Sequence, residues 1–456
     1  MKLFLRLLYL TSIILSFVIS TEIVAADSSG RWQGTLSIPS GDLEVIVVID
    51  ATNNTGTMDV PAQSLKGLPL DELTMTADAF SFEVKRLGII YKGTPSTDMI
   101  KGTFQQGPVF KTELNFARQS AQQVQAIEAK EARPQTPKGP FPYLEEEVSF
   151  VNGDITLAGT ITKPKGDGPF PAAIMITGSG PQDRDETILG HKPFAVIADH
   201  LSRRGILVLR FDDRGFAKST GVFKGATIDD FATDVEAAFQ FLLSRADVDT
   251  QKVGLIGHSE GGVVGPLMAK SNDKVAFMVS LAGIGTSPKE LYATQQRDML
   301  LLNGASNGQL IFDTFMEAID MVVSGKDAAA ISAFMKQGLN YPDNAANLLG
   351  NFMTDPWFIS LMKYDNAATL SQMTMPVLAI NGEKDIQVEP KANLAGFETY
   401  LTKAGNKDFT ITEIPGLNHL FQPSETGNPV EYGNIPITFD ESTLNLVGDW
   451  IVKRVQ

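Results

Sequence analysis

From about residue 141 to the end of the chain, short apolar runs alternate with segments of helical spacing. Residues 172–176 and 206–211, the latter interrupted only by Arg210, are apolar runs of the kind found in strands buried on both faces. Residues 228–243 place apolar side chains on one face of a helix. This alternation predicts an α/β fold for residues 141–456, with a mostly parallel sheet covered by helices.

The alternation is interrupted once, between a strand that ends near Leu281 and the next strand at 376–380. The intervening residues have helical periodicity and no strand pattern. Because a connection this long is usually a functional insertion, we predict a helical cap over the active site at about 285–374. Apolar residues such as Phe315 and Met335 could line a pocket there, although such spacing more often serves packing within the cap.

The N-terminus has the pattern of a cleaved signal peptide at residues 1–26. Lys2 and Arg6 precede an apolar stretch at 7–19, and Val-Ala-Ala at 24–26 offers a cleavage site. A retained membrane anchor is the alternative, but the stretch is short for a spanning helix. The absence of cysteine excludes disulfides, thiolate sites and a lipid-modified cysteine. We therefore expect a periplasmic or secreted protein with no membrane attachment in its mature form.

Two regions precede the α/β pattern. Residues 27–118 contain short strand-like runs separated by turn residues and hold no histidine, which predicts an all-β accessory domain. A substrate-docking or assembly module is the alternative. Residues 119–140 are polar and then proline-rich, which is typical of a linker. The formal charge of −15 disfavours nucleic acid or an anionic membrane surface as a partner. The oligomeric state does not follow from the sequence.

The strongest chemical signal is Gly-His-Ser-Glu-Gly-Gly at 257–262, which fits the pattern G-x-S-x-G. It directly follows a predicted buried strand at 253–256 and opens a predicted helix. A serine at such a turn is lifted above the sheet and lies next to the helix N-terminus. This context predicts Ser259 as a nucleophile rather than part of a structural turn.

A serine hydroxyl needs a base to remove its proton. The chain has four histidines, namely His191, His200, His258 and His419. The first two precede the nucleophile in the chain, and His258 is its neighbour and would point away from it. His419 lies in a loop after the last predicted strand, as the chain order serine, acid, histidine requires. We therefore predict His419 as the base.

The acid that orients this histidine should follow the strand at 376–380. Asp385 is the preferred candidate, and Glu383 is its rival because it lies nearer the end of the strand. An oxyanion hole also needs two N–H donors. The backbone N–H of Glu260 is one candidate, and that of Ser179, in the loop after the strand at 172–176, is the other.

Other kinds of site fail simple sequence checks. Gly178 and Gly180 begin a dinucleotide-binding pattern, but Asp183 replaces its third glycine. The chain has no H-E-x-x-H pattern and no phosphate-binding loop. We expect neither a metal nor an organic cofactor.

At these residues the sequence resembles exported bacterial α/β-hydrolases of the serine aminopeptidase-like and dienelactone hydrolase-like branch, many of which are esterases. The resemblance covers about 141–456 and rests on three segments, at 178–186, 210–221 and 257–262. It implies ester hydrolysis through an acyl-enzyme, with Ser259, Asp385 and His419 as the triad. The shared charged residues Asp183, Arg184, Asp212, Asp213 and Arg214 are expected to form a salt-bridged scaffold.

The leading hypothesis is a carboxylesterase acting on small-molecule esters. A serine aminopeptidase or thioesterase could use the same triad, because one fold supports several chemistries. Glu260 would favour an aminopeptidase if it bound a substrate amine, but a solvated carboxylate is the simpler expectation. The third hypothesis is a non-catalytic binding protein with a vestigial hydrolase domain, which an intact triad disfavours.

Overall fold

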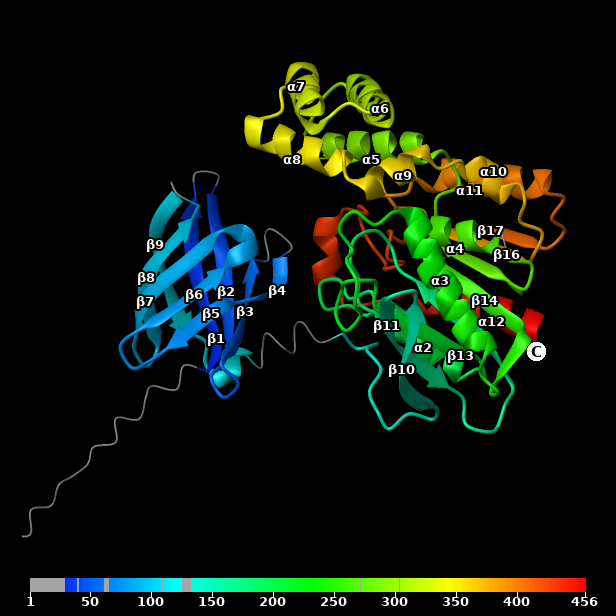
Figure 1. Cartoon of the computed structure of the whole chain (residues 1–456), viewed down its shortest axis with the longest axis horizontal. Coiled ribbons are helices and arrows are strands. Elements are labelled where there is room, and N and C mark those ends of the chain that lie inside the picture. The colour runs from blue at the N-terminus through cyan, green and yellow to red at the C-terminus, as the bar shows by residue number, and fades with distance from the viewer. Residues whose placement is uncertain are drawn as a thin grey trace, which may run out of the picture. The chain divides into compact units, whose positions relative to one another are not determined.

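The structure is a computed structural model that describes residues 29–38, 41–60, 65–107, 110–124, 133–270, 272–302 and 304–456. The predicted signal peptide at 1–26 lies outside these residues. The chain divides into two compact units, Met1–Lys130 and Glu131–Gln456 (Figure 1). In the described part of the chain, no helix has both the length and the apolar character needed to cross a bilayer.

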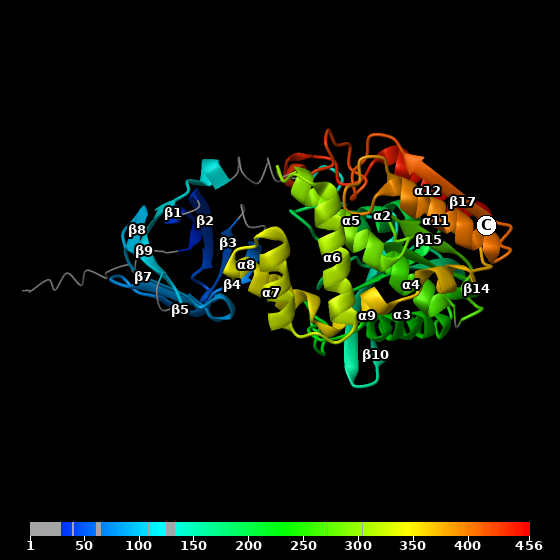
Figure 2. The same cartoon turned by 90° about the horizontal axis from the view of Figure 1, so that it is seen from above.

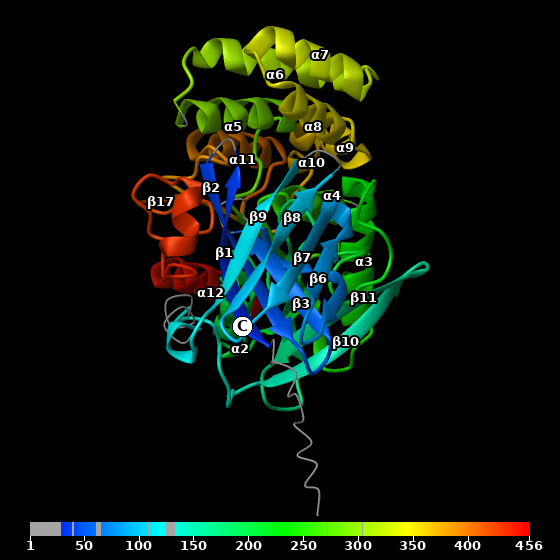
Figure 3. The ribbon, with the colours of Figure 1, turned by 90° about the vertical axis from the view of Figure 1, so that its left-hand side faces the viewer.

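The first unit is an antiparallel sheet with the strand order β4-β3-β2-β1-β9-β8-β7-β6-β5 (Figure 3). Only Leu70 separates β4 from β5, yet these strands are the two ends of that order. The sheet must therefore curl to bring its ends together, and large side chains such as Trp32, Tyr91 and Phe116 fill the core that it surrounds. The strands are β1 (Gly30–Ile38), β2 (Gly41–Asp50), β3 (Thr55–Val60), β4 (Leu65–Pro69), β5 (Asp71–Met75), β6 (Phe80–Val84), β7 (Ile89–Pro95), β8 (Met99–Gln106) and β9 (Phe110–Arg118).

The range 119–140, predicted as a linker, does not act as a linker throughout. Arg133 is only 6% exposed, and its guanidinium donates to the carbonyl oxygens of Leu189 and Gly433, at 2.8 Å each. The side chain of Gln135 bonds to the backbone of Phe439 at 2.7 Å. The second unit therefore includes residues before 141. The sequence was misleading because polar, proline-rich composition does not reveal that these side chains bind distant backbone groups.

The second unit is built on an eight-stranded mixed sheet with the order β10-β11-β13-β12-β14-β15-β16-β17. The strands are β10 (Leu144–Asn152), β11 (Ile155–Lys163), β12 (Phe170–Ile176), β13 (Leu207–Phe211), β14 (Val248–His258), β15 (Met278–Leu281), β16 (Val377–Gly382) and β17 (Phe409–Ile414). Pairing is parallel from β13 to β17, as expected, but β11 pairs antiparallel with both β10 and β13. The α/β architecture is thus confirmed. The sheet that was predicted to be mostly parallel is mixed, because β10, β11 and β13 pair antiparallel at one edge.

Helices cover both faces of this sheet. Successive residues of β12 point to opposite faces: Ala173 and Met175 pack in one core with α2 and α12, while Ile174 and Ile176 pack in another with α3, α4 and α11. This explains why the strands are apolar throughout rather than alternating. The helices are α2 (Pro193–Ser202), α3 (Ile228–Leu243), α4 (Gly261–Ala269), α11 (Pro390–Lys403) and α12 (Glu441–Val455).

The insertion between β15 and β16 is helical, as the sequence predicts. Its helices lie above the sheet in Figure 1, and Figure 2 views them from above. Phe315 and Met335 are fully buried in its packing. Its helices are α5 (Pro288–Leu302), α6 (Gly308–Val323), α7 (Ala328–Leu339), α8 (Asp343–Met353), α9 (Pro356–Lys363) and α10 (Asn366–Leu370). We call residues 285–374 the cap.

Candidate active site

Ser259 occupies the sharp turn between β14 and α4. Its φ is +52°, in the left-handed region that a residue with a side chain rarely adopts. Such a conformation costs on the order of 1–3 kcal/mol and persists only where its surroundings hold it. Here the Ser259 N–H donates to the carbonyl of Leu281 at 2.9 Å, and the Ser259 carbonyl accepts from Gly262 at 2.9 Å.

The glycines on either side of Ser259 are required by close backbone approach. A Cβ at Gly257 would lie 2.1 Å from the carbonyl oxygen of Gly261. A Cβ at Gly261 would lie 2.3 Å from the carbonyl oxygen of Ile176. The G-x-S-x-G spacing therefore has a steric cause, because side chains at either position would push the turn open.

Asp385 and His419 form a buried pair. His419 Nδ1 lies 2.7 Å from Asp385 Oδ2, and the two residues are 5% and 3% exposed. The other oxygen, Asp385 Oδ1, accepts from the backbone N–H groups of Gln387 at 2.8 Å and Val388 at 2.9 Å. A carboxylate held in this way fixes the orientation of the imidazole and can stabilise its protonated form.

The two residues meet because of the sheet topology. Asp385 follows β16 and His419 follows β17, and these strands are parallel neighbours, so their carboxyl ends lie at one edge. Ser259 follows β14 at the same edge. Its neighbour His258 packs against His419, with ring centroids 4.8 Å apart.

Glu383, the rival acid, is engaged elsewhere. It is exposed, and its Oε2 accepts from the backbone N–H of Gly416 at 2.8 Å. The structure thus pairs Asp385 with His419, and Glu383 stabilises the loop that leads to His419.

The histidines that precede Ser259 have structural partners. His191 is buried between the hydroxyl of Thr438, at 2.9 Å, and the carbonyl of Tyr432, at 3.0 Å. Burial lowers the pKa of His191 to about 4, with a further contribution from the charge of Arg133. Burial and the charge of Arg204 likewise lower the pKa of His200 to about 4.

The two predicted oxyanion donors face one cavity. Ser179, Ser259 and Glu260 all line a cavity of about 210 Å³. The N–H of Gly178 donates to Glu186 at 2.7 Å, so it is already engaged. Within the described residues, no backbone hydrogen bond is assigned to the N–H groups of Ser179 and Glu260. That these N–H groups form an oxyanion hole stays a prediction.

The cap supplies most of the remaining walls of this cavity, and most of these are apolar or aromatic. The cap residues predicted as possible pocket residues, such as Phe315 and Met335, are buried in its interior instead. The cap residues that line this cavity are Pro288, Leu291, Tyr292, Gln295, Gln296, Phe352, Trp357, Leu361 and Met362.

Glu260 is buried rather than solvated, which corrects the expectation from the sequence. It is 4% exposed, and the indole N–H of Trp357 donates to both of its carboxylate oxygens, at 3.0 and 2.9 Å. Burial raises the pKa of Glu260 to about 7. No local pattern in the sequence reveals this contact, because Trp357 lies in the cap, far away in the chain.

Three of the five charged residues of the resemblance, Arg184, Asp212 and Arg214, form ion pairs, as expected of a scaffold. Arg184 lies 2.7 Å from Asp212, and Arg214 lies 2.6 Å from Asp234. Asp183 instead accepts the backbone N–H groups of Asp185 and Thr187, at 3.0 Å each. Asp213 differs from the others. Its carboxylate accepts from the Thr177 hydroxyl and the Gln182 N–H, at 2.8 Å each, and burial raises its pKa well above the usual value.

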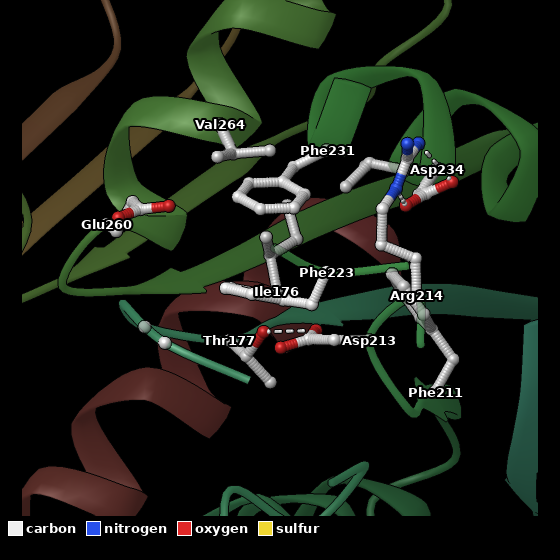
Figure 4. A pocket seen from close by; sticks show the side chains of 13 residues that line it. Ile176, Thr177, Phe211, Asp213, Arg214, Phe223, Phe231, Asp234, Glu260 and Val264 are labelled. Atoms are coloured by element: carbon white, nitrogen blue, oxygen red, sulfur yellow. Dashed lines mark hydrogen bonds and ion pairs between the residues drawn. The ribbon is translucent and has the colours of Figure 1, made fainter. Parts of the chain in front are cut away.

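Asp213 and Glu260 both line a second cavity of about 30 Å³ (Figure 4). Across the described part of the chain, no group of three or more His, Asp or Glu side chains could hold a metal ion.

Three comparisons relate the chain to known proteins. The family model described as serine aminopeptidase, S33, matches residues 192–425, about half of the chain. Esterase EstD of Thermotoga maritima is 31% identical over 319 residues, which cover 68% of this chain and 69% of that protein.

Among solved structures, the α/β hydrolase GrgF from Penicillium sp. sh18 is 18% identical, with a TM-score of 0.44 over 68% of this chain and 99% of that chain. The Pyrococcus furiosus esterase PF2001 is 16% identical, with a TM-score of 0.44 over 71% of this chain and 97% of that one. The family match and the EstD similarity agree with the turn at Ser259 and with the sheet. This chain belongs to the serine aminopeptidase (S33) family of α/β-hydrolase enzymes.

Proposed function

We propose that the protein is a carboxylesterase that cleaves uncharged carboxylic esters with small or medium acyl groups through an acyl-enzyme. The observation that carries the proposal is the 2.7 Å contact between His419 and Asp385, at the same sheet edge as the strained turn of Ser259. EstD, the relative with 31% identity, is described as an esterase.

In the proposed reaction, the Ser259 hydroxyl attacks the ester carbonyl carbon while His419 takes its proton. Asp385 stabilises the resulting imidazolium. The N–H groups of Ser179 and Glu260 bind the oxyanion of the tetrahedral intermediate. When the intermediate collapses, the C–O bond to the alcohol breaks and His419 returns the proton to the leaving oxygen. Water then attacks the acyl-enzyme by the same route and releases the acid.

The cavity favours uncharged substrates. Its walls include Tyr292, Phe352 and Trp357, and the one acidic group among them, Glu260, is bonded to the indole of Trp357. Recognition of a free amino group, as in an aminopeptidase, needs a carboxylate that faces the substrate. The engagement of Glu260 therefore supports an esterase over a peptidase.

Export is a further part of the proposal. The basic residues Lys2 and Arg6, the apolar stretch and the Val-Ala-Ala sequence at 24–26 support cleavage after Ala26. N-terminal sequencing of the protein from the periplasm or medium should find Asp27 first. Recovery of the uncleaved chain in the membrane fraction would instead indicate an anchor.

The activity is tested with p-nitrophenyl esters of increasing acyl length and with aminoacyl p-nitroanilides. We expect ester hydrolysis that is abolished in Ser259→Ala and retained in Ser442→Ala, an exposed serine near the start of α12. Cleavage of the anilides alone would make the protein a peptidase. Full activity of Ser259→Ala would exclude Ser259 as the nucleophile.

A further inference from the structure

Glu186 and His258 form a second acid and histidine pair beside the first. Glu186 is 4% exposed and His258 is 7% exposed. Glu186 Oε1 lies 2.9 Å from His258 Nδ1 and also accepts the N–H of Gly178 at 2.7 Å. On the other side of the ring, His258 Nε2 lies 3.1 Å from the backbone carbonyl oxygen of His419. Neither Glu186 nor His258 is part of the triad or the oxyanion hole.

The partners of His258 determine its protonation. A carbonyl oxygen and an ionised carboxylate both accept hydrogen bonds and cannot donate them. Both ring nitrogens of His258 must then donate, which requires an imidazolium. The Glu186 oxygen that faces Nδ1 also accepts the N–H of Gly178, so the geometry marks this oxygen as a hydrogen-bond acceptor.

The charged surroundings agree with this assignment. Burial alone would lower the pKa of His258, but the charge and hydrogen bond of Glu186, together with the His419 carbonyl and the charge of Asp385, leave the pKa raised. The other titratable ring nearby is that of His419, and the charge of Glu186 contributes to the raised pKa of Asp213.

The pair connects three loops that must act together. Gly178 precedes the oxyanion donor Ser179, His258 precedes Ser259, and the His419 carbonyl belongs to the proposed base itself. We propose that Glu186 and His258 form a buried, charged bridge that positions the oxyanion loop, the nucleophile turn and the base loop relative to one another. The inference rests on the proposed function, and both are positioning residues that do not touch the substrate.

The ionic form of the bridge also suits the reaction electrostatically. When His419 takes the proton of Ser259, a positive charge develops beside His258. The negative charge of Glu186 balances the positive charge of the His258 imidazolium. The bridge therefore adds no net charge that would oppose proton transfer from Ser259 to His419. Its geometry is restrained, since Glu186 has a φ of +51° and its N–H donates to the carbonyl of Asp183 at 2.9 Å.

The protonation state can be measured on the unaltered protein, without an activity assay. With ¹⁵N-labelled histidine there are four rings to assign, and loss of a signal in His258→Asn identifies that ring. At pH 7 we expect both nitrogens of His258 to carry protons, while His191 and His200 are neutral because their pKa values are about 4. An unprotonated Nδ1 or Nε2 on His258 would overturn the inference.

Variants then test the positioning role on p-nitrophenyl butyrate. His258→Asn can retain a donor to Glu186, whereas His258→Gln can retain a donor to the His419 carbonyl, so the two substitutions separate the halves of the bridge. For both, and for Glu186→Gln, we expect kcat to fall roughly 10- to 100-fold with little change in KM, as for a small misplacement of reacting groups. The matched control is His200→Asn in α2, which should keep the parental kcat.

The outcomes separate this inference from the proposed function. If all three variants kept kcat within about twofold of the parent, the bridge would have no positioning role. If Ser259→Ala retained activity, the proposed function would fail while the ring signals would still report on the bridge. Should a variant not fold, the spectrum of the unaltered protein decides.

Discussion

The indole N–H of Trp357 donates to both carboxylate oxygens of Glu260, at 3.0 and 2.9 Å. This contact joins helix α9 of the cap to the residue that directly follows Ser259. Because the Glu260 N–H is a proposed oxyanion donor, the contact couples the position of the cap to the geometry of the site. The same contact stabilises the ionised form of the buried Glu260 carboxylate through one aromatic side chain.

We expect Trp357→Phe to destabilise the second unit more at pH 8 than at pH 5. At pH 8 Glu260 is ionised, and removal of its donor leaves a buried carboxylate without that partner, at a cost of about 1–3 kcal/mol. At pH 5 Glu260 is protonated, because burial raises its pKa to about 7. The substitution should then lower the free energy of unfolding by less. Urea unfolding at the two pH values measures the difference.

Trp450→Phe is the matched control for this comparison. The indole of Trp450 donates to the hydroxyl of Thr410 at 3.1 Å, which is a neutral acceptor. Loss of this hydrogen bond should lower the free energy of unfolding by the same amount at both pH values. An equal pH dependence for the two variants would show that Trp357 does not stabilise the ionised form of Glu260.

Glu260→Gln should remove a pH dependence of stability. The usual pKa of Glu is 4.5, and burial raises that of Glu260 to about 7. Between these values the folded protein holds a proton that the unfolded chain releases, so the stability of the parent falls as pH rises through this window. The fall is about 3 kcal/mol, from 1.36 kcal/mol per pKa unit, and is complete above pH 7.

The free energy of unfolding at pH 4.5, 5.5, 7 and 8 checks this expectation. The Gln variant should gain stability relative to the parent as pH rises, while Glu398→Gln, on the exposed surface of α11, should follow the parent. Parallel curves for parent and Glu260→Gln would mean that Glu260 titrates as it does in the unfolded chain.

The acid of the proposed triad can be tested by two isosteric substitutions. Asp385→Asn should lower kcat roughly 10³- to 10⁴-fold, because the amide no longer fixes the tautomer of His419 or stabilises its charge. Glu383→Gln should change kcat little, since Glu383 is exposed and bonds to the Gly416 backbone. Ester hydrolysis by both purified variants measures this, and a larger loss for Glu383→Gln would reverse the assignment.

Much of the second unit could be predicted because its chemistry is local. Residues 228–243 form α3 with the predicted bounds, and the run at 206–211 contains the whole of β13. The position of Ser259 between a buried strand and a helix follows from glycine spacing. The pairing of Asp385 with His419 follows in turn from strand order, since loops after adjacent parallel strands meet at one edge.

The sequence failed where long-range contacts decide the environment. Strand β10 begins Leu-Glu-Glu-Glu, and its exposed edge position removes the apolar run that marks the central strands. The burial of Glu260 depends on Trp357, and the role of Glu186 depends on His258, which the sequence places far away. No local pattern reports such contacts.

Arg133 provides the last prediction, since it stabilises the second unit from a segment that looks like a linker. Its guanidinium donates to the carbonyls of Leu189 and Gly433 at 2.8 Å and of Ile435 at 3.2 Å. Arg133→Ala leaves these buried acceptors without this donor, so we expect a loss of about 2–4 kcal/mol in the free energy of unfolding.

Urea denaturation followed by tryptophan fluorescence measures the effect of Arg133→Ala, because Trp357 and Trp450 both lie in the second unit. Arg203→Ala is the control. Its side chain is 48% exposed and pairs with Asp199 one helical turn away, so its loss should cost at most about 1 kcal/mol. Equal losses for the two variants would mean that residues 133–140 contribute no more than a surface ion pair, and a linker over the whole of 119–140 would then describe the chain better.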